Sequence, residues 1–258
     1  MKIKNLLFNF IKKKYFFSII KKFFKRFEKD TSAEAKLWAK SKVRNTTEEF
    51  CQSIDSLLYD EVKSDTTFIE KESKERLSKI NVSFGGCGNY ILLYFLIRKF
   101  KLANIVETGV AAGWTSLSVL RALKKNGNGY LYSSDFPYFR LEDPEKYIGY
   151  LAENESNKDS WFLDIRGDDV ALPEIIKKME NKSIDLFHYD SDKSYSGRAN
   201  AIKSLNSKIK SKTIIIFDDI QNNLHFKDFV EKENKDFYVF EFDGKFTGIT
   251  GLNYFIYK

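Results

Sequence analysis

From about residue 81 onward, short apolar runs alternate with segments in which apolar residues repeat at helical spacing. The runs are NIVET, GYLYSSD, SWFLDIR, SIDLFHYD, TIIIFDDI, FYVFEFD and LNYFIYK. Strands that alternate with helices are typical of an α/β domain built on a mostly parallel sheet. Ligands of such sheets bind at the carboxyl ends of the strands. The pattern therefore predicts both a fold class and the edge at which chemistry should be sought.

Two regions precede this domain. The chain divides into a basic segment over 1–30, a helical extension over 31–80 and the α/β domain over 81–258. In the extension, Thr31 and Glu34 have the spacing of a capping box, which predicts the start of a helix. Two more helices are expected, one beginning near Thr46 and one covering roughly 66–80.

The positive charge of the chain is concentrated at its N-terminus. The net charge is +7, and residues 1–30 hold ten basic and two acidic residues, which leaves −1 for the other 228 residues. A neutral body argues against nucleic acid as a partner. The apolar residues of this segment fall on two helical faces, and none of its apolar runs approaches the roughly 20 residues that span a bilayer. The segment is expected to contact the surface of an anionic membrane, the body of the protein or a second subunit of a homodimer.

The few cysteines and histidines exclude two further classes. The two Cys (Cys51 and Cys87) and two His (His188 and His225) lack the close spacing of the usual zinc site with four Cys or His ligands, and they supply no disulfide framework. A cytoplasmic protein is expected, located at the inner face of the membrane if the basic segment binds lipid.

The first predicted strand of the domain leads into a glycine-containing turn. Glu107, Gly109 and Gly113 follow the spacing Glu-x-Gly-x-x-x-Gly, and a helix follows. Glycines permit a tight turn and the close approach of a ligand, and the amides of a helix N-terminus favour an anion. The dinucleotide-binding pattern would require glycine at 111 and 114, where Ala111 and Trp114 stand. A nicotinamide cofactor is therefore not favoured.

Acidic residues follow each of the next strands. Asp135 ends the second run, where a carboxylate suits ribose hydroxyls, although a turn or cap residue is an alternative. Asp168 follows the third run and would face an adenine amine or cap the helix that contains Pro173.

The fourth and fifth runs end in a double acidic cluster, formed by Asp190 with Asp192 and by Asp218 with Asp219. Oxygen ligands of this kind suit a hard ion such as Mg²⁺. Successive strand residues point to opposite faces, so Asp218 and Asp219 can share a metal only if the strand has already turned.

In their order along the chain, these motifs resemble class I S-adenosylmethionine-dependent methyltransferases, and in detail the bacterial methyltransferase domain 24 group. The resemblance extends from about Gly85 to the end of the sequence, about two-thirds of the chain, and it is carried by GGCGNYILLYFLIRKFK, IVETGVAAGWTSLSVLRAL, GYLYSSDFPYF, YIGYL, GDDVALP, HYDSDKSYSGR and IIIFDDIQNNLHFKDFVEK. The resemblance implies a Rossmann-like doubly wound sheet of seven strands, mostly parallel with an antiparallel last strand, preceded here by N-terminal helices.

The resemblance also implies how S-adenosylmethionine would bind. The cofactor loop would contain Glu107, Gly109 and Gly113, with Thr115 near the methionine carboxylate and Asp135 near the ribose. Asp168 is expected near the adenine.

The segment from Asp190 to Tyr195 resembles the Asp-Ala-Asp-Lys segment of metal-dependent caffeoyl-CoA and catechol O-methyltransferases. There the first Asp binds the metal and the Lys is a candidate base, whereas macrolide-sugar O-methyltransferases place an Asp two residues after the first. The implied metal ligands are Asp190, Asp218 and Asp219, and the implied base is Asp192 or Lys193. This sequence departs from the plant pattern by having Asp219 in place of Asn, and from its own group by having Lys193 in place of the commoner His.

The expected activity is methylation of a hydroxyl on a small molecule, sugar or glycan, with S-adenosylmethionine as the donor and with assistance from a divalent cation such as Mg²⁺. Chelation should then abolish turnover while cofactor binding survives. Two alternatives are a non-catalytic scaffold that retains the fold and a metal-dependent hydroxylase or hydrolase on the same sheet.

Overall fold

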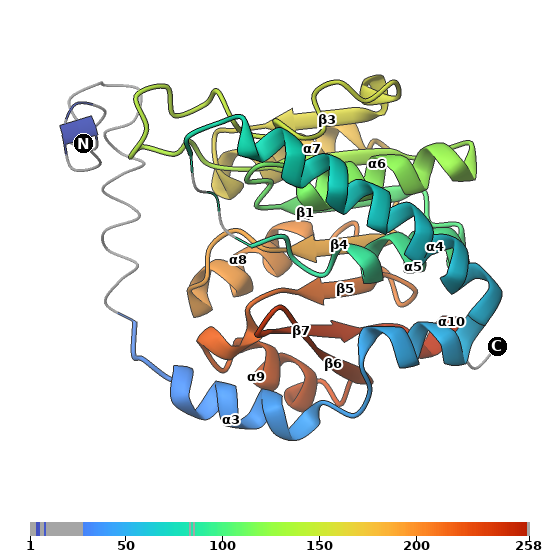
Figure 1. The fold of residues 1–258 in the computed structure, drawn as a ribbon. Coiled ribbons are helices and arrows are strands. Elements are labelled where there is room, and N and C mark those ends of the chain that lie inside the picture. The colour runs from blue at the N-terminus through green and yellow to red at the C-terminus, as the bar shows by residue number, and fades with distance from the viewer. Residues whose placement is uncertain (1–3, 6–7, 9–27, 83, 85, 257–258) are drawn as a thin grey trace.

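The computed structural model describes residues 4–5, 8, 28–82, 84 and 86–256 (Figure 1). Most of the basic segment, and with it the predicted amphipathic helical faces, lies outside the described residues. Among the helices that are described, none combines the length and the apolar character needed to cross a membrane.

Seven strands form a single sheet in the order β3-β2-β1-β4-β5-β7-β6 (Figure 1). The pairs within β3-β2-β1-β4-β5 are parallel, and β7 runs antiparallel to both of its neighbours. The sheet is therefore the Rossmann-like sheet with an antiparallel last strand that the sequence predicts. The strands are β1 (Asn104–Thr108), β2 (Tyr130–Ser134), β3 (Trp161–Asp164), β4 (Leu186–Tyr189), β5 (Ile214–Phe217), β6 (Phe237–Phe242) and β7 (Lys245–Thr250).

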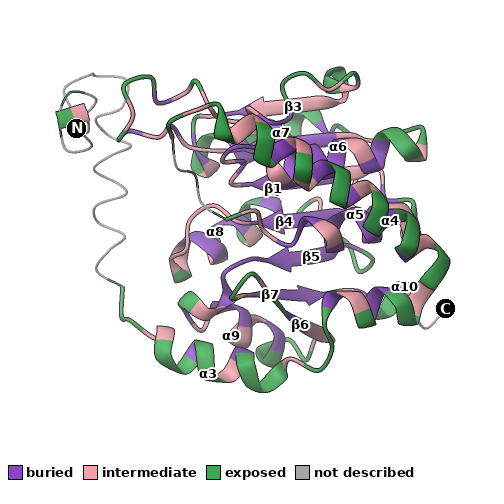
Figure 2. Ribbon diagram, viewed as in Figure 1, coloured by how far each residue is buried: buried purple, intermediate pink, exposed green. Residues whose placement is uncertain are grey.

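Helices cover both faces of the sheet, and a separate buried cluster lies under each layer (Figure 2). Along β1, Ile105 belongs to one cluster and Val106 to the other, because successive strand residues point to opposite faces. Burial on both faces explains why the parallel strands read as nearly continuous apolar runs. One layer contains α4 (Thr47–Ser78), α5 (Tyr90–Phe100) and α6 (Trp114–Asn126), and the other α3 (Ser32–Lys42), α7 (Asp168–Lys178), α8 (Tyr195–Leu205) and α9 (His225–Lys232).

The prediction for the last strand is wrong in position. Residues 252–258 were expected to form it, but β7 lies at Lys245–Thr250, and Asn253–Ile256 forms the short helix α10. Asp243 and Gly244 both have left-handed backbone angles, with φ of 50° and 72°. Two such residues form the tight turn that joins hairpin strands, and Asp-Gly is a frequent pair there. The chain therefore reverses directly after β6, earlier than predicted.

The predicted helix boundaries before the domain also need correction. The Thr31 side chain does not cap α3, and instead its hydroxyl accepts the Leu224 amide at 3.3 Å. The capping box lies at Thr46, which exchanges hydrogen bonds with Glu49 at the start of α4. The two helices expected there form one element, interrupted at Asp55 by a non-helical backbone (φ −164°, ψ 95°).

Candidate active site

The carboxyl ends of β1, β2 and β4 meet at one edge of the sheet. The Gly109 amide donates to the Ser134 carbonyl at 2.8 Å, and the Asp190 amide donates to the Thr108 carbonyl at 2.9 Å. Gly109 has a φ of +84°, and a Cβ placed on it would lie 2.5 Å from the carbonyl carbon of Asp190. The predicted cofactor loop therefore passes directly against the acidic end of β4, which only a glycine permits.

Glu107 is fully buried at the end of β1, where three hydroxyl groups surround it. Its carboxylate accepts hydrogen bonds from Thr115 at 2.5 Å, Ser116 at 2.6 Å and Ser133 at 2.8 Å. Hydrogen bonds of this kind are what permit a carboxylate to be buried. Thr115, which was expected near the methionine carboxylate, thus donates its hydroxyl to Glu107. Sequence reasoning missed Ser116 and Ser133, whose only signal is a hydroxyl residue at a helix start or a strand end.

Asp135 holds the cofactor loop from the side of β2. Its carboxylate accepts the amides of Ala111 at 2.7 Å and of Phe136 at 2.5 Å. Ala111 has a left-handed φ of 50°, and Gly113, with a φ of 95°, precedes the first residue of α6. Asp135 thereby fixes a loop conformation that L-residues seldom adopt unaided.

Asp168 joins the ends of two strands. It is the first residue of α7, and its carboxylate accepts the hydroxyls of Ser134 and Ser191, each at 2.5 Å. No side chain caps this helix at its preceding residue, Gly167. Asp168 therefore ties the end of β2 to the segment after β4. It is not the N-cap residue of α7, and its place near the adenine stays a prediction.

Tyr138, which sequence reasoning missed, lies near the carboxylates of Asp135 and Asp190. Burial, followed by the negative charges of Asp135 and Asp190, raises the pKa of Tyr138. The ring of Phe84 packs edge-on against the Tyr138 ring, with centroids 5.4 Å apart. Tyr138, from the segment after β2, therefore lies near the carboxylates that follow β2 and β4, and it packs against Phe84 from the segment before α5.

Asp218 and Asp219 follow β5 at a turn. Asp219 has a left-handed φ of 53°, so the strand has already turned when it reaches the second carboxylate. Arg198 from α8 is fully buried, and its Nη2 donates to the carbonyls of Asp218 at 2.9 Å and Asp219 at 2.8 Å. The turn lets both side chains line one pocket, which the alternation of an extended strand would not permit.

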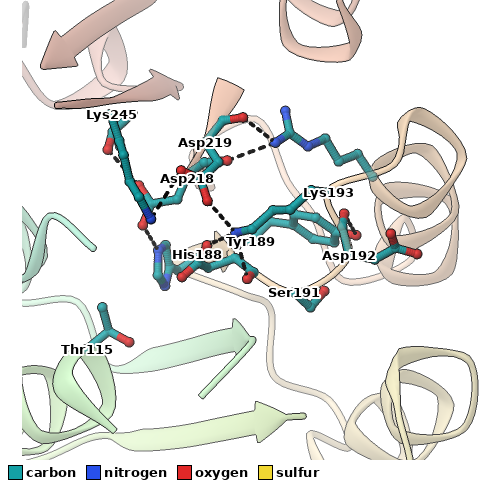
Figure 3. Close-up of polar contacts among 12 residues, drawn as sticks. Thr115, His188, Tyr189, Ser191, Asp192, Lys193, Asp218, Asp219 and Lys245 are labelled. Carbon is teal, nitrogen blue, oxygen red and sulfur yellow. Dashed lines mark hydrogen bonds and ion pairs between the residues drawn. The ribbon is translucent and has the colours of Figure 1, made fainter. Parts of the chain in front are cut away.

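Lys193 lies between the carboxylates of Asp190 and Asp219 (Figure 3). Its ammonium group forms ion pairs with Asp190 and, at 3.0 Å, with Asp219. A second ammonium group, that of Lys245 on β7, lies 3.4 Å from the other oxygen of Asp219. Burial lowers the pKa of Lys193, but the charges of Asp190 and Asp219 outweigh burial and raise that pKa above its usual value. Burial raises the pKa of Asp190, and Lys193 offsets only part of the rise.

Asp218 has a separate set of partners. His188 Nε2 lies 3.0 Å from its Oδ2, and the Thr247 hydroxyl donates to its Oδ1 at 2.6 Å. Burial raises the pKa of Asp218, but the hydrogen bond and charge of His188 lower it below the usual value. For His188 burial lowers the pKa, and its bond to Asp218 reverses the direction. His188 is thus a buried partner of a site carboxylate.

The arrangement of these carboxylates does not fit the expected metal site. Asp190 and Asp219 share Lys193, whereas Asp218 is bound by His188 and Thr247. Within the described part of the chain, no three His, Cys, Asp or Glu side chains come together as metal ligands would. The position between Asp190 and Asp219 that a divalent cation would need is filled by an ammonium group.

Asp192 faces the start of α8. Its Oδ1 accepts the Ser194 amide at 3.0 Å, and a Cβ placed on Gly197 would lie 2.7 Å from its Cγ. Lys193 points to Asp190 and Asp219, as described above. The structure therefore places the two candidate bases outside the lining of the pocket that contains the other carboxylates.

This pocket encloses about 310 Å³, including open space at its mouth, beyond the ends of β4 and β5. Its other walls come from the segment before α5 and from the β6–β7 turn, which sequence reasoning placed incorrectly. Burial, and then the charge of Asp243, raise the pKa of the Cys87 thiol to about 11, so this wall presents a neutral thiol. The lining residues are Gly86, Cys87, Gly88, Asn89, Asp190, Asp218, Asp219, Phe242, Asp243, Lys245 and Thr247.

Comparisons with known proteins agree with this fold. A family model described as a methyltransferase domain matches residues 106–220, from β1 through Asp218 and Asp219. A candidate caffeoyl-CoA O-methyltransferase from Staphylococcus aureus shares 14% identity with a TM-score of 0.53, over 76% of this chain and 97% of that one. A second similar structure is the O-methyltransferase TomG from Streptomyces achromogenes, which is involved in tomaymycin synthesis and was solved with S-adenosylmethionine. It shares 13% identity with a TM-score of 0.52, over 70% of this chain and 86% of that one. No curated protein matches the sequence.

Proposed function

We propose that this protein is a class I S-adenosylmethionine-dependent methyltransferase that transfers a methyl group to a hydroxyl oxygen of an acceptor held beside Asp190, because a methyltransferase domain model matches residues 106–220. The observation that carries the proposal is the contact between the cofactor loop and the acidic pocket. Gly109 of the loop leaves no room for a Cβ against the Asp190 backbone, and the Asp190 side chain lines the pocket. A donor at the loop and an acceptor in the pocket would therefore meet at the end of β4.

The transfer requires alignment and removal of one proton. The acceptor oxygen forms a bond to the methyl carbon as the carbon–sulfur bond breaks, and the hydroxyl proton passes to a base. Alignment can supply on the order of 7–11 kcal/mol, and a positioned base roughly 10²–10⁴-fold in rate. The products are the methyl ether and S-adenosylhomocysteine.

We assign the base to Asp190. It lines the pocket, and its burial raises its pKa, which makes the ionised carboxylate a stronger base than an exposed one. Lys193, whose raised pKa keeps it protonated, would orient Asp190 and Asp219 as a fixed cation. Asp192 would position the loop through its bond to the Ser194 amide.

The charge of the pocket supports a neutral, hydroxyl-rich acceptor such as a sugar or glycan unit. Among the described residues, four carboxylates line it, from Asp190, Asp218, Asp219 and Asp243, together with the ammonium group of Lys245. The Lys193 ammonium group pairs with two of the four, so the carboxylates still outnumber the ammonium groups. Because these carboxylates would repel the negative charge of a phosphate, a phosphate-bearing acceptor is disfavoured. The names of the two O-methyltransferases that share the fold support oxygen as the atom methylated.

The proposal is tested first by calorimetry with S-adenosylmethionine, then by transfer of labelled methyl to hydroxylated sugars and phenols, with and without EDTA. We expect cofactor binding and turnover to persist in EDTA, because Lys193 stands where a cation would bind. Loss of turnover alone in EDTA would restore the metal-assisted mechanism. Absence of cofactor binding would favour the scaffold, and consumption of acceptor without the methyl donor would favour a hydroxylase or hydrolase.

Asp190→Asn tests the base. Turnover should fall by on the order of 10²-fold or more, while the Kd for S-adenosylmethionine changes by less than about threefold. Glu174→Gln is the matched control, because it makes the same change of carboxylate to amide at an exposed ion pair with Lys177 on α7. An Asp190→Asn enzyme as active as this control would remove Asp190 from the mechanism.

A further inference from the structure

The outer side of the cofactor loop is held by the segment that follows β2. The Gly149 amide donates to the Ala111 carbonyl, and the Leu151 amide donates to the Ala112 carbonyl, both at 2.9 Å. A Cβ placed on Gly113 would lie 3.0 Å from the Cα of Gly149. Residues 149–151 are therefore a second support of the loop, opposite the Asp135 carboxylate that binds the Ala111 amide.

One arginine from the last turns of α4 grips this segment. Arg76 Nη1 donates to the Leu151 carbonyl and Nη2 to the Tyr150 carbonyl, each at 2.6 Å. The guanidinium group also lies over the Tyr150 ring, 5.0 Å from its centroid, and 3.7 Å from a carboxylate oxygen of Glu153. Only 18% of the Arg76 side chain is exposed. A planar guanidinium can hold two neighbouring carbonyls at once, which a lysine ammonium cannot do with the same geometry.

We propose that Arg76 is a positioning residue for S-adenosylmethionine. It fixes residues 150 and 151, these fix the Ala111–Gly113 backbone, and that backbone forms the cofactor loop. The helical extension would thus contribute to cofactor affinity without contacting the cofactor. This inference rests on the proposed function only in requiring that the loop binds S-adenosylmethionine.

The test is calorimetry with S-adenosylmethionine on the full chain and two variants, Arg76→Ala and Arg76→Lys. Loss of two charge-assisted hydrogen bonds that order the loop should raise the Kd of Arg76→Ala by about 10- to 100-fold. Arg76→Lys should bind S-adenosylmethionine with intermediate affinity, because lysine retains the positive charge but lacks the planar guanidinium that donates to both carbonyls. An unchanged Kd in Arg76→Ala would overturn the proposal.

Arg98→Ala is the matched control. Arg98 on α5 is buried to a similar extent, with 11% of its side chain exposed, and it donates to Glu61 at 2.9 Å and to Asn126 at 3.1 Å. Its loss should lower the free energy of unfolding and leave the Kd unchanged. An equal rise of the Kd in this variant would reduce Arg76 to a general stabilising role.

Hydrogen exchange separates this inference from the proposed function. The Gly149 and Leu151 amides should exchange faster in Arg76→Ala than in the wild type without any ligand. If wild-type protein binds no S-adenosylmethionine, the proposed function fails, and faster exchange at these amides would still support the coupling. Unchanged exchange would contradict the coupling itself. Should Arg76→Ala fail to fold, Arg76→Lys gives the same comparisons.

Discussion

His225 is a buried neutral imidazole at the start of α9. It is 5% exposed, it stacks on Phe229 with centroids 5.9 Å apart, and its Nδ1 has no hydrogen-bond partner within the described structure. Burial, and then the charge of Arg198, lower the pKa of His225 to about 4. Aromatic rings therefore surround the imidazole.

The depressed pKa of His225 predicts a loss of stability in acid. A histidine with a pKa near 6.5 when unfolded and near 4 when folded stabilises the fold above pH 6.5, and this contribution is lost as the pH falls toward 4. At pH 5 the wild type should lose about 2 kcal/mol of unfolding free energy from this group, relative to pH 8. Urea unfolding of wild type and His225→Gln at both pH values measures it. Parallel losses in the two proteins would show that His225 is protonated as easily when folded as when unfolded.

At the scale of elements, the cofactor loop depends on backbone conformation at glycines. Gly109 and Gly127 have similar left-handed φ angles, +84° and +79°, but different surroundings. A Cβ at Gly109 would collide with the backbone of Asp190, whereas nothing lies within 4 Å of a Cβ at Gly127. The two positions therefore separate backbone strain from the packing of the loop against β4.

We expect Gly127→Ala to cost about 1–2 kcal/mol of unfolding free energy, which is the strain of a left-handed alanine. Gly109→Ala should cost more than Gly127→Ala, because the end of β4 must also move, and it should weaken S-adenosylmethionine binding by roughly tenfold or more. Urea unfolding and calorimetry on both variants supply the comparison. Equal losses of stability with equal affinities would mean that the contact between Gly109 and Asp190 does not position the cofactor.

The strands and the acidic residues that follow them could be predicted from the sequence. Parallel strands bury both faces, so their apolar runs and the acidic residues that follow them, such as Asp190, are visible in the chain. The partners of those carboxylates are not. Thr247 and Lys245 reach Asp218 and Asp219 only because the turn at Asp243 starts β7 early. Placing the last strand a few residues too late therefore removed one wall of the pocket from the prediction.

At the scale of the whole molecule, the helical extension shares its core with the sheet. Trp38 of α3 stacks on Phe237 of β6, with ring centroids 5.5 Å apart, and donates from Nε1 to Glu231 at 3.0 Å. Phe50 of α4 packs against Phe240 at 5.0 Å. These contacts join residues 31–80 to the β6 edge of the sheet, while Arg76 joins them to residues 150–151 beside the cofactor loop. We propose that the extension and the catalytic domain unfold as one unit.

Trp38→Ala tests this unity. Removing a half-buried indole that bridges α3 and β6 should lower the unfolding free energy by about 2–3 kcal/mol, within a transition that stays single. Circular dichroism reports on the helices, and the fluorescence of Trp114 and Trp161 reports on α6 and β3. The unfolding midpoints from both signals should therefore shift to the same lower urea concentration. Leu37→Ala is the neighbouring control, since Leu37 is 72% exposed and its loss should change stability by less than about 0.5 kcal/mol. If Trp38→Ala gives an early loss of helix while the fluorescence midpoint stays at its wild-type value, the extension unfolds separately from the domain it supports.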